Sequence, residues 1–505
     1  MAGLNPIAEA RRKAEALTQV GQIDRAIAVL RNAAEESPAD PAGWRGLAEA
    51  LAGANRPDLA VVAWRTALGL DPNSAPTLIG EGRALYALGR AANAGAAFER
   101  ALKLAPTLVE ARYGLALLAF DRGDYDEAAT QVQALPATPA VAWLNARTAG
   151  ARGAWDLART ILDELMATPG LAIHLRAEAL LLLAQALDRL GRSSEAFPNA
   201  MEGKAIQHRL FAPRAAGREG ETAKLERLAA WFAAAEPRDW ISAPLTAGAS
   251  GHLFLVGFPR SGTTLLEQAL AAHPSVIALE EAPTLADAYQ EFLTTAEGLE
   301  RLARIDAAEA ARWRAHYWRT VRAHGAEPAD RVFLDKAPAG TLNLPLVAKL
   351  FPDAKVLFAV RDPRAVVLSC AMSAFQMNAT TYAFTSLAET ARCYAASMAL
   401  ADTYRRVLPL AWQEVRYENL VADLATELTG VCAFAGLQFD PAMVDIATAA
   451  RGRVVRTPSA VDVREGLSRR GLDRWRAYEY ELAPVMATLA PWIERFGYTV
   501  GNSEA

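Results

Sequence analysis

The chain has 505 residues, 52% of them hydrophobic and 22% charged, and its formal net charge is −4. This length allows two or three domains with sizeable cores, and the slight acidic excess argues against a nucleic-acid-binding protein. Cys370, Cys393 and Cys432 form no disulfide or metal-ligand pattern. Their apolar surroundings indicate buried thiols in a reducing compartment.

The first residues of the chain, MAGLNPIAEARRKAEALTQ, lack the apolar core of a signal peptide, and no apolar run in the sequence reaches the length of a membrane span. We therefore expect a soluble cytoplasmic protein without a membrane span. The heavy use of Ala and Arg is typical of a GC-rich bacterial genome.

The N-terminal part of the sequence repeats with a period of 34 residues, seen first in Pro38, Pro72 and Pro106. A turn residue, a small residue and a larger apolar residue repeat with the same period. They are, in that order, Gly21, Asn55, Gly89 and Gly123; Ala26, Ala60, Ala94 and Ala128; Leu30, Trp64, Phe98 and Val132. This is the period of the tetratricopeptide repeat, in which small residues let paired helices approach and bulky ones fill the gap.

The period slips after about residue 135, but turn-to-small spacings continue at Gly153 and Gly191. We predict an all-α tetratricopeptide-type solenoid over residues 1–210, with degenerate helical pairs such as 179–190 and 194–207. Its concave face is expected to bind a peptide or partner protein. Alternatively, the solenoid serves as a scaffold or dimerisation arm without a ligand. A helical linker over 211–250, with a short helix at 225–235, precedes the second domain at 251–505.

From about residue 250, short β-rich runs alternate with helical stretches, which predicts an α/β domain with a parallel sheet. Strands are expected at 253–257, 276–279, 332–335, 355–360 and 412–416.

A glycine-rich loop follows the first of these strands and opens a helix. Its spacing is close to a Walker A loop, but Thr263 stands at the lysine position and Arg260 lies inside the loop. The loop therefore favours a single phosphoryl-type group over a triphosphate. The anion-binding candidates are Arg260, Ser261, Gly262, Thr263 and Thr264.

The segment Gly257-Phe-Pro-Arg-Ser-Gly-Thr-Thr264 resembles the 5′-phosphosulfate loop of sulfotransferases that use 3′-phosphoadenosine 5′-phosphosulfate (PAPS). It is most similar to tyrosylprotein sulfotransferases and to bacterial proteins that fuse tetratricopeptide repeats to such a domain. The resemblance implies PAPS as donor, 3′-phosphoadenosine 5′-phosphate (PAP) as product, and no metal.

The resemblance also assigns roles at two strand ends. Glu281 follows Arg260 by 21 residues, the family's distance to the catalytic base, which takes the proton of the acceptor hydroxyl. Lys336, in Asp-Lys-Ala-Pro, corresponds to a lysine that offsets charge on the leaving oxygen. Pro283 stands where the eukaryotic enzymes carry an arginine that holds an acidic peptide. This departure from the family pattern argues against a tyrosine peptide as the acceptor.

Five further positions match the family's contacts to the nucleotide or to the transferred group. Arg361 and Ser369 keep the spacing of its 3′-phosphate site, although Ser373 replaces a third arginine there. Tyr417 lies in a Val-Arg-Tyr-Glu-Asn-Leu motif near the nucleotide. Ser459 and Arg474, fifteen residues apart, match a serine that contacts transition-state oxygens and a basic residue that contacts the nucleotide.

The sequence thus predicts a PAPS-dependent sulfotransferase acting on a hydroxyl group. A P-loop kinase or NTPase and a non-catalytic repeat adaptor are the alternatives. Peptide tyrosine, carbohydrate, lipid and small phenols all remain open as acceptors, and the repeats favour a protein or peptide. A homodimer is the default expectation for such folds.

Overall fold

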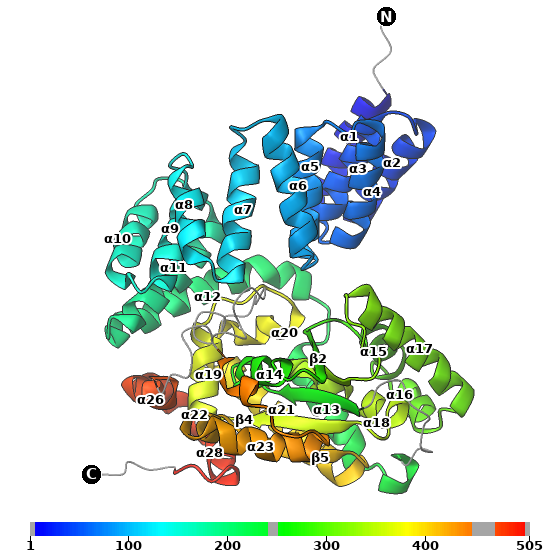
Figure 1. The fold of residues 1–505 in the computed structure, drawn as a ribbon, viewed down its shortest axis with the longest axis vertical. Coiled ribbons are helices and arrows are strands. Elements are labelled where there is room, and N and C mark those ends of the chain that lie inside the picture. The colour runs from blue at the N-terminus through cyan, green and yellow to red at the C-terminus, as the bar shows by residue number, and fades with distance from the viewer. Residues whose placement is uncertain (1–5, 241–250, 447–469, 500–505) are drawn as a thin grey trace, which may run out of the picture. The chain divides into compact units, whose positions relative to one another are not determined.

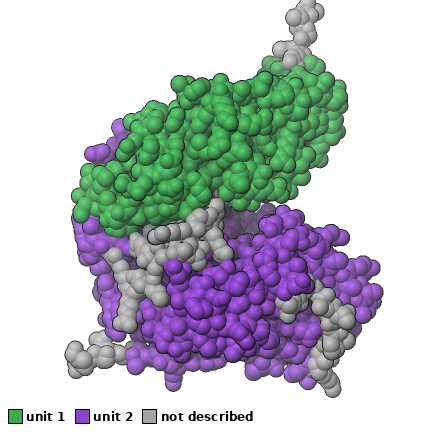
Figure 2. Space-filling model, in the orientation of Figure 1, with its two compact units in different colours: residues 1–161 green, residues 162–505 purple. Residues whose placement is uncertain are grey.

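Residues 6–240, 251–446 and 470–499 are described in the computed structural model. They divide between two units, residues 1–161 and 162–505, which Figure 2 colours separately.

The first unit consists of helices joined by short turns (Figure 1). The turns carry left-handed residues where the 34-residue period places them, with φ of 76° at Gly21, 57° at Asn55 and 76° at Gly89. Proline follows the end of every second helix, because it cannot continue the helical hydrogen bonding. The helices are α1 (Pro6–Gln19), α2 (Ile23–Glu36), α3 (Pro41–Gly53), α4 (Pro57–Leu70), α5 (Ala75–Ala87), α6 (Ala91–Leu104), α7 (Val109–Arg122), α8 (Tyr125–Gln133), α9 (Pro139–Ala151) and α10 (Trp155–Met166).

Large side chains in this unit pack against small ones, as the repeat predicts. Phe98 is buried, and a Cβ added at Gly82 or Gly114 would come within 2.6 Å or 2.5 Å of its ring. Trp64 meets Gly80 in the same way, at 2.4 Å. These contacts confirm that bulky repeat positions pack directly against small residues of neighbouring helices.

Three helices open the second unit: α11 (Ile173–Arg189), α12 (Ser193–Ala215) and α13 (Glu221–Ala233). The predicted helical pair is confirmed, although α12 continues eight residues beyond the predicted end at residue 207 and contains Pro198 and Pro213.

The second unit is built on one five-stranded sheet in the order β2-β3-β1-β4-β5. All neighbouring strands are parallel, so their carboxyl ends meet at one edge. The strands are β1 (Gly251–Gly257), β2 (Val276–Glu280), β3 (Val332–Lys336), β4 (Lys355–Val360) and β5 (Ala411–Arg416). Each of the five predicted strands is confirmed, and the predicted parallel α/β domain with it.

Helices cover both faces of the sheet (Figure 1). On one face, Leu255 and Leu357 pack in a core with side chains of α14 (Thr263–Ala271), α22 (Tyr417–Ala422) and α23 (Leu424–Ala435). On the other, the ring of Phe254 lies against Tyr317 of α17 (Ala307–Ala323), with 6.3 Å between centroids. Strand residues alternate between these faces, so both sets are buried.

The other helices of the second unit are α15 (Ala286–Phe292), α16 (Ala296–Ala303), α18 (Leu344–Leu350), α19 (Pro363–Met372), α20 (Ala379–Tyr382), α21 (Leu387–Val407), α26 (Arg470–Asp473), α27 (Glu479–Leu482) and α28 (Met486–Arg495). The 3₁₀ turns are η1 (Pro237–Trp240), η2 (Pro338–Asn343), η3 (Ala383–Thr385), η4 (Pro441–Val444), η5 (Arg474–Tyr478) and η6 (Ala483–Val485). Among the described helices, none combines the length and the apolar character needed to cross a bilayer.

Candidate active site

The glycine-rich loop joins β1 to α14 at the carboxyl edge of the sheet. Arg260 and Gly262 both have left-handed backbone, with φ of 73° and 96°, and α14 begins at Thr263. The side chains of Ser261, Thr263 and Thr264 are buried. The first N–H groups of a helix have no partner within it, so this turn gathers amides and hydroxyls suited to an anion.

Gly257 and Gly262 are required by close approaches of neighbouring chain. A Cβ on Gly257 would lie 2.7 Å from the carbonyl oxygen of Ala359 on β4. A Cβ on Gly262 would lie 2.6 Å from Cδ2 of Tyr417. Glycine at both positions therefore lets β4 and Tyr417 pack directly against the loop.

Four of the predicted donor residues meet beside this loop, and we call them the arginine corner: Arg260, Arg361, Ser369 and Tyr417. Arg260 Nε donates to Ser369 Oγ over 2.9 Å, and Arg361 Nη1 donates to the backbone oxygen of Arg260 over 3.1 Å. The Arg361 guanidinium lies 4.3 Å from the centre of the Tyr417 ring. Residues from the loop, α19 and α22 thus converge as the spacing predicted.

A second group lies at the ends of β2 and β3, and we call it the lysine–carboxylate cluster: Lys336, Glu280, Glu281 and Glu267. Lys336 Nζ is 2.9 Å from Oε1 of Glu280 and 2.9 Å from Oε1 of Glu281. It lies 3.8 Å from Oε2 of Glu267 on α14. Burial acts to lower the pKa of Lys336, but the three carboxylates outweigh it and raise the pKa, so the amine stays charged.

Glu281 is placed by an unusual backbone conformation just after β2. Its φ is 48°, and its N–H donates to the carbonyl oxygen of Lys336 over 2.8 Å. Its side chain is 46% exposed, whereas those of Glu280 and Glu267 are 24% and 5% exposed. A strained non-glycine residue held by the sheet edge is common at functional sites, and Glu281 is the carboxylate of this cluster most accessible to an acceptor.

A series of buried hydrogen bonds links Asp335, at the end of β3, to neighbouring elements. Thr284 Oγ1 and Tyr317 Oη both donate to Oδ2 of Asp335, over 2.8 Å and 2.7 Å. His252 Nε2 is 2.9 Å from Tyr317 Oη. Because the single hydroxyl hydrogen of Tyr317 goes to Asp335, the imidazole donates from Nε2. Burial lowers the pKa of His252 to about 3 and raises that of Asp335 to about 6 against the two hydrogen bonds.

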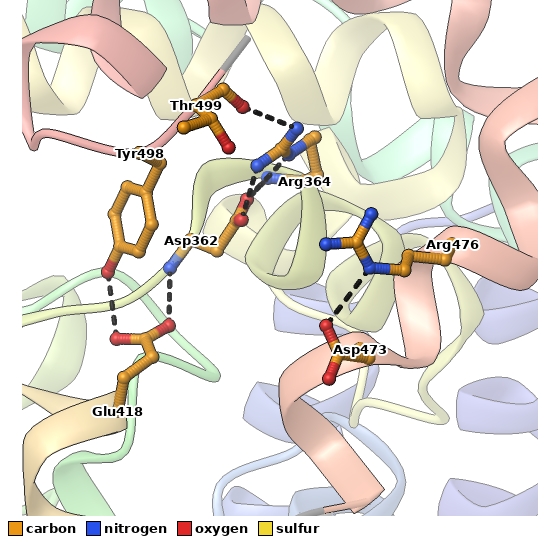
Figure 3. A network of polar contacts seen from close by, with 7 residues as sticks. All are labelled: Asp362, Arg364, Glu418, Asp473, Arg476, Tyr498 and Thr499. Atoms are coloured by element: carbon orange, nitrogen blue, oxygen red, sulfur yellow. Dashed lines mark hydrogen bonds and ion pairs between the residues drawn. The ribbon is translucent and has the colours of Figure 1, made fainter. Parts of the chain in front are cut away.

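The segment Arg361-Asp-Pro-Arg364 is fixed by a polar network (Figure 3). Asp362 caps α19 and binds the guanidinium of Arg364, with 2.7 Å between Oδ2 and Nη2. Glu418 accepts from the N–H of Asp362 over 3.0 Å and from Tyr498 Oη over 2.8 Å. Arg364 also stacks on Trp475 at 3.7 Å. Arg364 is therefore a structural residue, and Arg361 is the arginine of this segment that lies in the arginine corner.

Of the two remaining predicted site residues, Arg474 lies among the described residues and is ion-paired away from the arginine corner. Arg474 lies at the end of α19 near Met372, where its Nε donates to Oδ1 of Asp188 on α11 over 3.0 Å. The same carboxylate accepts from Tyr478 Oη over 2.6 Å. In this structure Arg474 is thus ion-paired with α11. Ser459 lies outside the described residues.

The sequence analysis missed Glu267, Asp335 and Asp188. Glu267 stands four residues after Thr263, so one helical turn carries it to the same face of α14. That spacing is the signal that was available. Asp335 directly precedes Lys336 in the Asp-Lys-Ala-Pro motif, but the motif only identifies the lysine and gives the aspartate no role. Nothing local marks Asp188, because its partner lies 286 residues away.

Comparisons with known proteins match both the repeat part and the α/β part of the chain. Residues 252–441 match the model of the sulfotransferase family, and residues 17–76 and 79–142 match tetratricopeptide repeat models. The chain joins tetratricopeptide repeats to a sulfotransferase-family domain. Within the described residues, no group of three or more His, Cys, Asp or Glu side chains is arranged to hold a metal.

Two relatives illustrate how far the sequence likeness extends. The nodulation protein NoeE of Sinorhizobium fredii is 30% identical over 44% of this chain and 59% of its own length. Protein-tyrosine sulfotransferase 2 of Gallus gallus is 27% identical over 49% of this chain and 69% of its own. A solved sulfotransferase domain from the curacin biosynthetic pathway is 20% identical over 51% of this chain and all of its own, with a TM-score of 0.36. The chain spans 36%, 59% and 34% of the length of the first three curated relatives.

Proposed function

We propose that the protein is a sulfotransferase that moves a sulfuryl group from PAPS to a hydroxyl acceptor. The observation that carries this proposal is the pairing of two sites at one sheet edge. The arginine corner lies on one side of the β1–α14 loop, and the lysine–carboxylate cluster lies on the other. The residues that match the sulfotransferase family, 252–441, include every member of both groups.

The residues of the arginine corner suit a doubly phosphorylated nucleotide. Nε of Arg361 is buried and has no hydrogen-bond partner among the described residues, so a donor remains for an anion. The loop from Gly257 to Thr264 would hold the 5′-phosphosulfate, and Arg361 with Ser369 the 3′-phosphate. Tyr417, packed on Gly262, would border the nucleotide. Arg474 would join this set by exchanging its partner Asp188 for the nucleotide.

The donor, when bound, supplies the sulfuryl group. Glu281 would take the proton from the acceptor hydroxyl, since it is the most exposed carboxylate of its cluster. Lys336 would place its charge beside the leaving oxygen, and the carboxylates around it hold the amine charged and aimed at the edge. Glu280 and Glu267 position Lys336. Ser459 is proposed for contacts to the transferred oxygens.

We propose that the acceptor hydroxyl is carried by a protein or peptide, which the repeat unit would bind. The repeats and the likeness to a protein-tyrosine sulfotransferase support this choice. Because Pro283 replaces the arginine with which the eukaryotic enzymes hold an acidic acceptor peptide, the acceptor of this protein would be bound differently. We further propose a cytoplasmic location, which three free cysteines fit, a homodimeric state, and catalysis without metal.

Nucleotide binding tests the donor assignment directly. PAP at about 100 times its Kd should add roughly 2.7 kcal/mol to the stability of the domain, which corresponds to a rise of several degrees in Tm. Adenosine 5′-phosphate should give a smaller shift, and ATP with magnesium should give no larger one. A larger shift with ATP and magnesium would favour a kinase or NTPase, and no shift with any nucleotide would favour a repeat adaptor.

A further inference from the structure

Lys204 is a buried cation without a counter-charge. It lies on α12, outside the matched residues 252–441, and its side chain is fully buried. Nζ has no hydrogen-bond partner in the described part of the chain, and no carboxylate there forms an ion pair with it. The ring of Phe375, at 5.4 Å, faces the amine. Burying an unpaired ammonium is costly, so such groups are usually paired or bind an anion.

His208 anchors α12 to the segment that follows α19. His208, one turn further along the same face, contacts Thr385 Oγ1 over 2.9 Å through Nδ1 and Tyr382 Oη over 3.0 Å through Nε2. The His208 and Tyr382 rings also stack, with centroids 4.7 Å apart. α12 also packs against α19, the helix that carries Ser369.

α19 carries a buried thiol next to Ser369 of the arginine corner. Cys370 follows Ser369 directly, and its Sγ donates to the carbonyl oxygen of Pro259 over 3.3 Å. Burial raises the pKa of this thiol, while Arg260, Lys204 and Arg361 all act to lower it. Three cations from separate elements therefore act on this thiol, which agrees with the packing of α12 against α19. Burial lowers the pKa of Lys204 to about 8.

We propose that Lys204 binds the 3′-phosphate of the donor nucleotide together with Arg361 and Ser369. Lys204 Nζ and Arg361 Nε are both buried donors without partners in the described residues, and the helix that carries Lys204 packs against α19, which carries Ser369. A phosphate there would accept from each and compensate the buried charge. This inference rests on the proposed function, and it makes α12 part of the donor site.

The test uses the full chain and isothermal titration calorimetry with PAP and with adenosine 5′-phosphate. Lys204→Met removes the charge and keeps the length. We expect it to weaken PAP binding by about 10- to 100-fold and to leave binding of adenosine 5′-phosphate within about twofold. Lys204→Arg keeps the charge and should retain most of the preference for PAP. Arg209→Met, at an exposed position on the same helix, is the matched control and should bind like the wild type.

The outcomes separate this inference from the proposed function. If the wild type does not bind PAP, both fall. If it binds PAP and Lys204→Met binds it equally well, only the role of Lys204 falls. An equal loss for both nucleotides would show a structural role and overturn the 3′-phosphate assignment. The melting temperature of each variant without nucleotide checks folding, and Lys204→Gln replaces Lys204→Met if the latter does not fold.

Discussion

At the scale of single residues, Glu280 and Glu281 are neighbours that bind the same amine yet differ in exposure. Glu281→Gln removes the proposed base, so we expect kcat to fall by about 10² to 10⁴. The affinity for PAP should stay within about twofold, because Glu281 lies in the lysine–carboxylate cluster and away from the arginine corner. Steady-state kinetics and calorimetry on the same preparations measure both quantities.

Glu280→Gln is the matched control for this experiment. It removes one of the two close carboxylates from Lys336 but leaves Glu281, so kcat should fall less than tenfold. If Glu280→Gln abolished turnover and Glu281→Gln did not, the base would be Glu280. Equal loss of turnover and of PAP binding in Glu281→Gln would argue against any base assignment to this residue.

At the scale of elements, β3 carries a buried carboxylate whose charge the fold disfavours. Asp335 has a pKa raised from 3.8 to about 6 by burial, against the opposing hydrogen bonds from Tyr317 and Thr284. Between pH 4 and 6 the folded chain therefore holds a proton that the unfolded chain has lost. The stability contributed by this group is largest at low pH and declines as the pH rises towards 6, by up to about 3 kcal/mol.

Asp335→Asn should abolish this dependence, because an amide does not titrate. We expect the free energy of unfolding of the variant, relative to the wild type, to rise by up to about 3 kcal/mol between pH 4 and pH 7. Denaturant melts at several pH values measure it. Asp330→Asn, at an exposed aspartate, is the control. A difference between Asp335→Asn and wild type that did not change with pH would show that Asp335 does not titrate in this range.

The elements also show what could be predicted from the sequence and what could not. The five strands and the repeat turns were predictable, because apolar runs, glycines and prolines act within a few residues. Arg361, Ser369 and Tyr417 of the arginine corner were assigned through the resemblance to sulfotransferases, whose motifs are local in the sequence. The ion pair of Asp188 with Arg474 and the burial of Lys204 arise from tertiary packing of α11 and α12. No local pattern encodes such contacts, so the contribution of these helices to the site was missed.

At the scale of the whole molecule, every described residue assigned to the donor or to proton transfer lies in the unit of residues 162–505. The unit of residues 1–161 has its own core, in which Phe98 packs with Trp64, Leu78 and Leu118. Repeat arrays are stabilised mainly by contacts between neighbouring repeats. Loss of packing in that core should therefore destabilise the whole array. The nucleotide site should keep its structure, because its residues pack within the other unit.

Phe98→Ala tests this division of labour. Removing a buried phenylalanine that fills the space between Gly82 and Gly114 should destabilise the repeat unit by about 3–5 kcal/mol, seen as an earlier first transition in calorimetric melting. The affinity for PAP and its stabilisation of the later transition should not change. Val62→Thr, at an exposed position of the same array, is the control and should move neither transition. If Phe98→Ala weakened PAP binding tenfold or more, the repeats would be energetically coupled to the donor site, and the array would regulate catalysis as well as bind the acceptor.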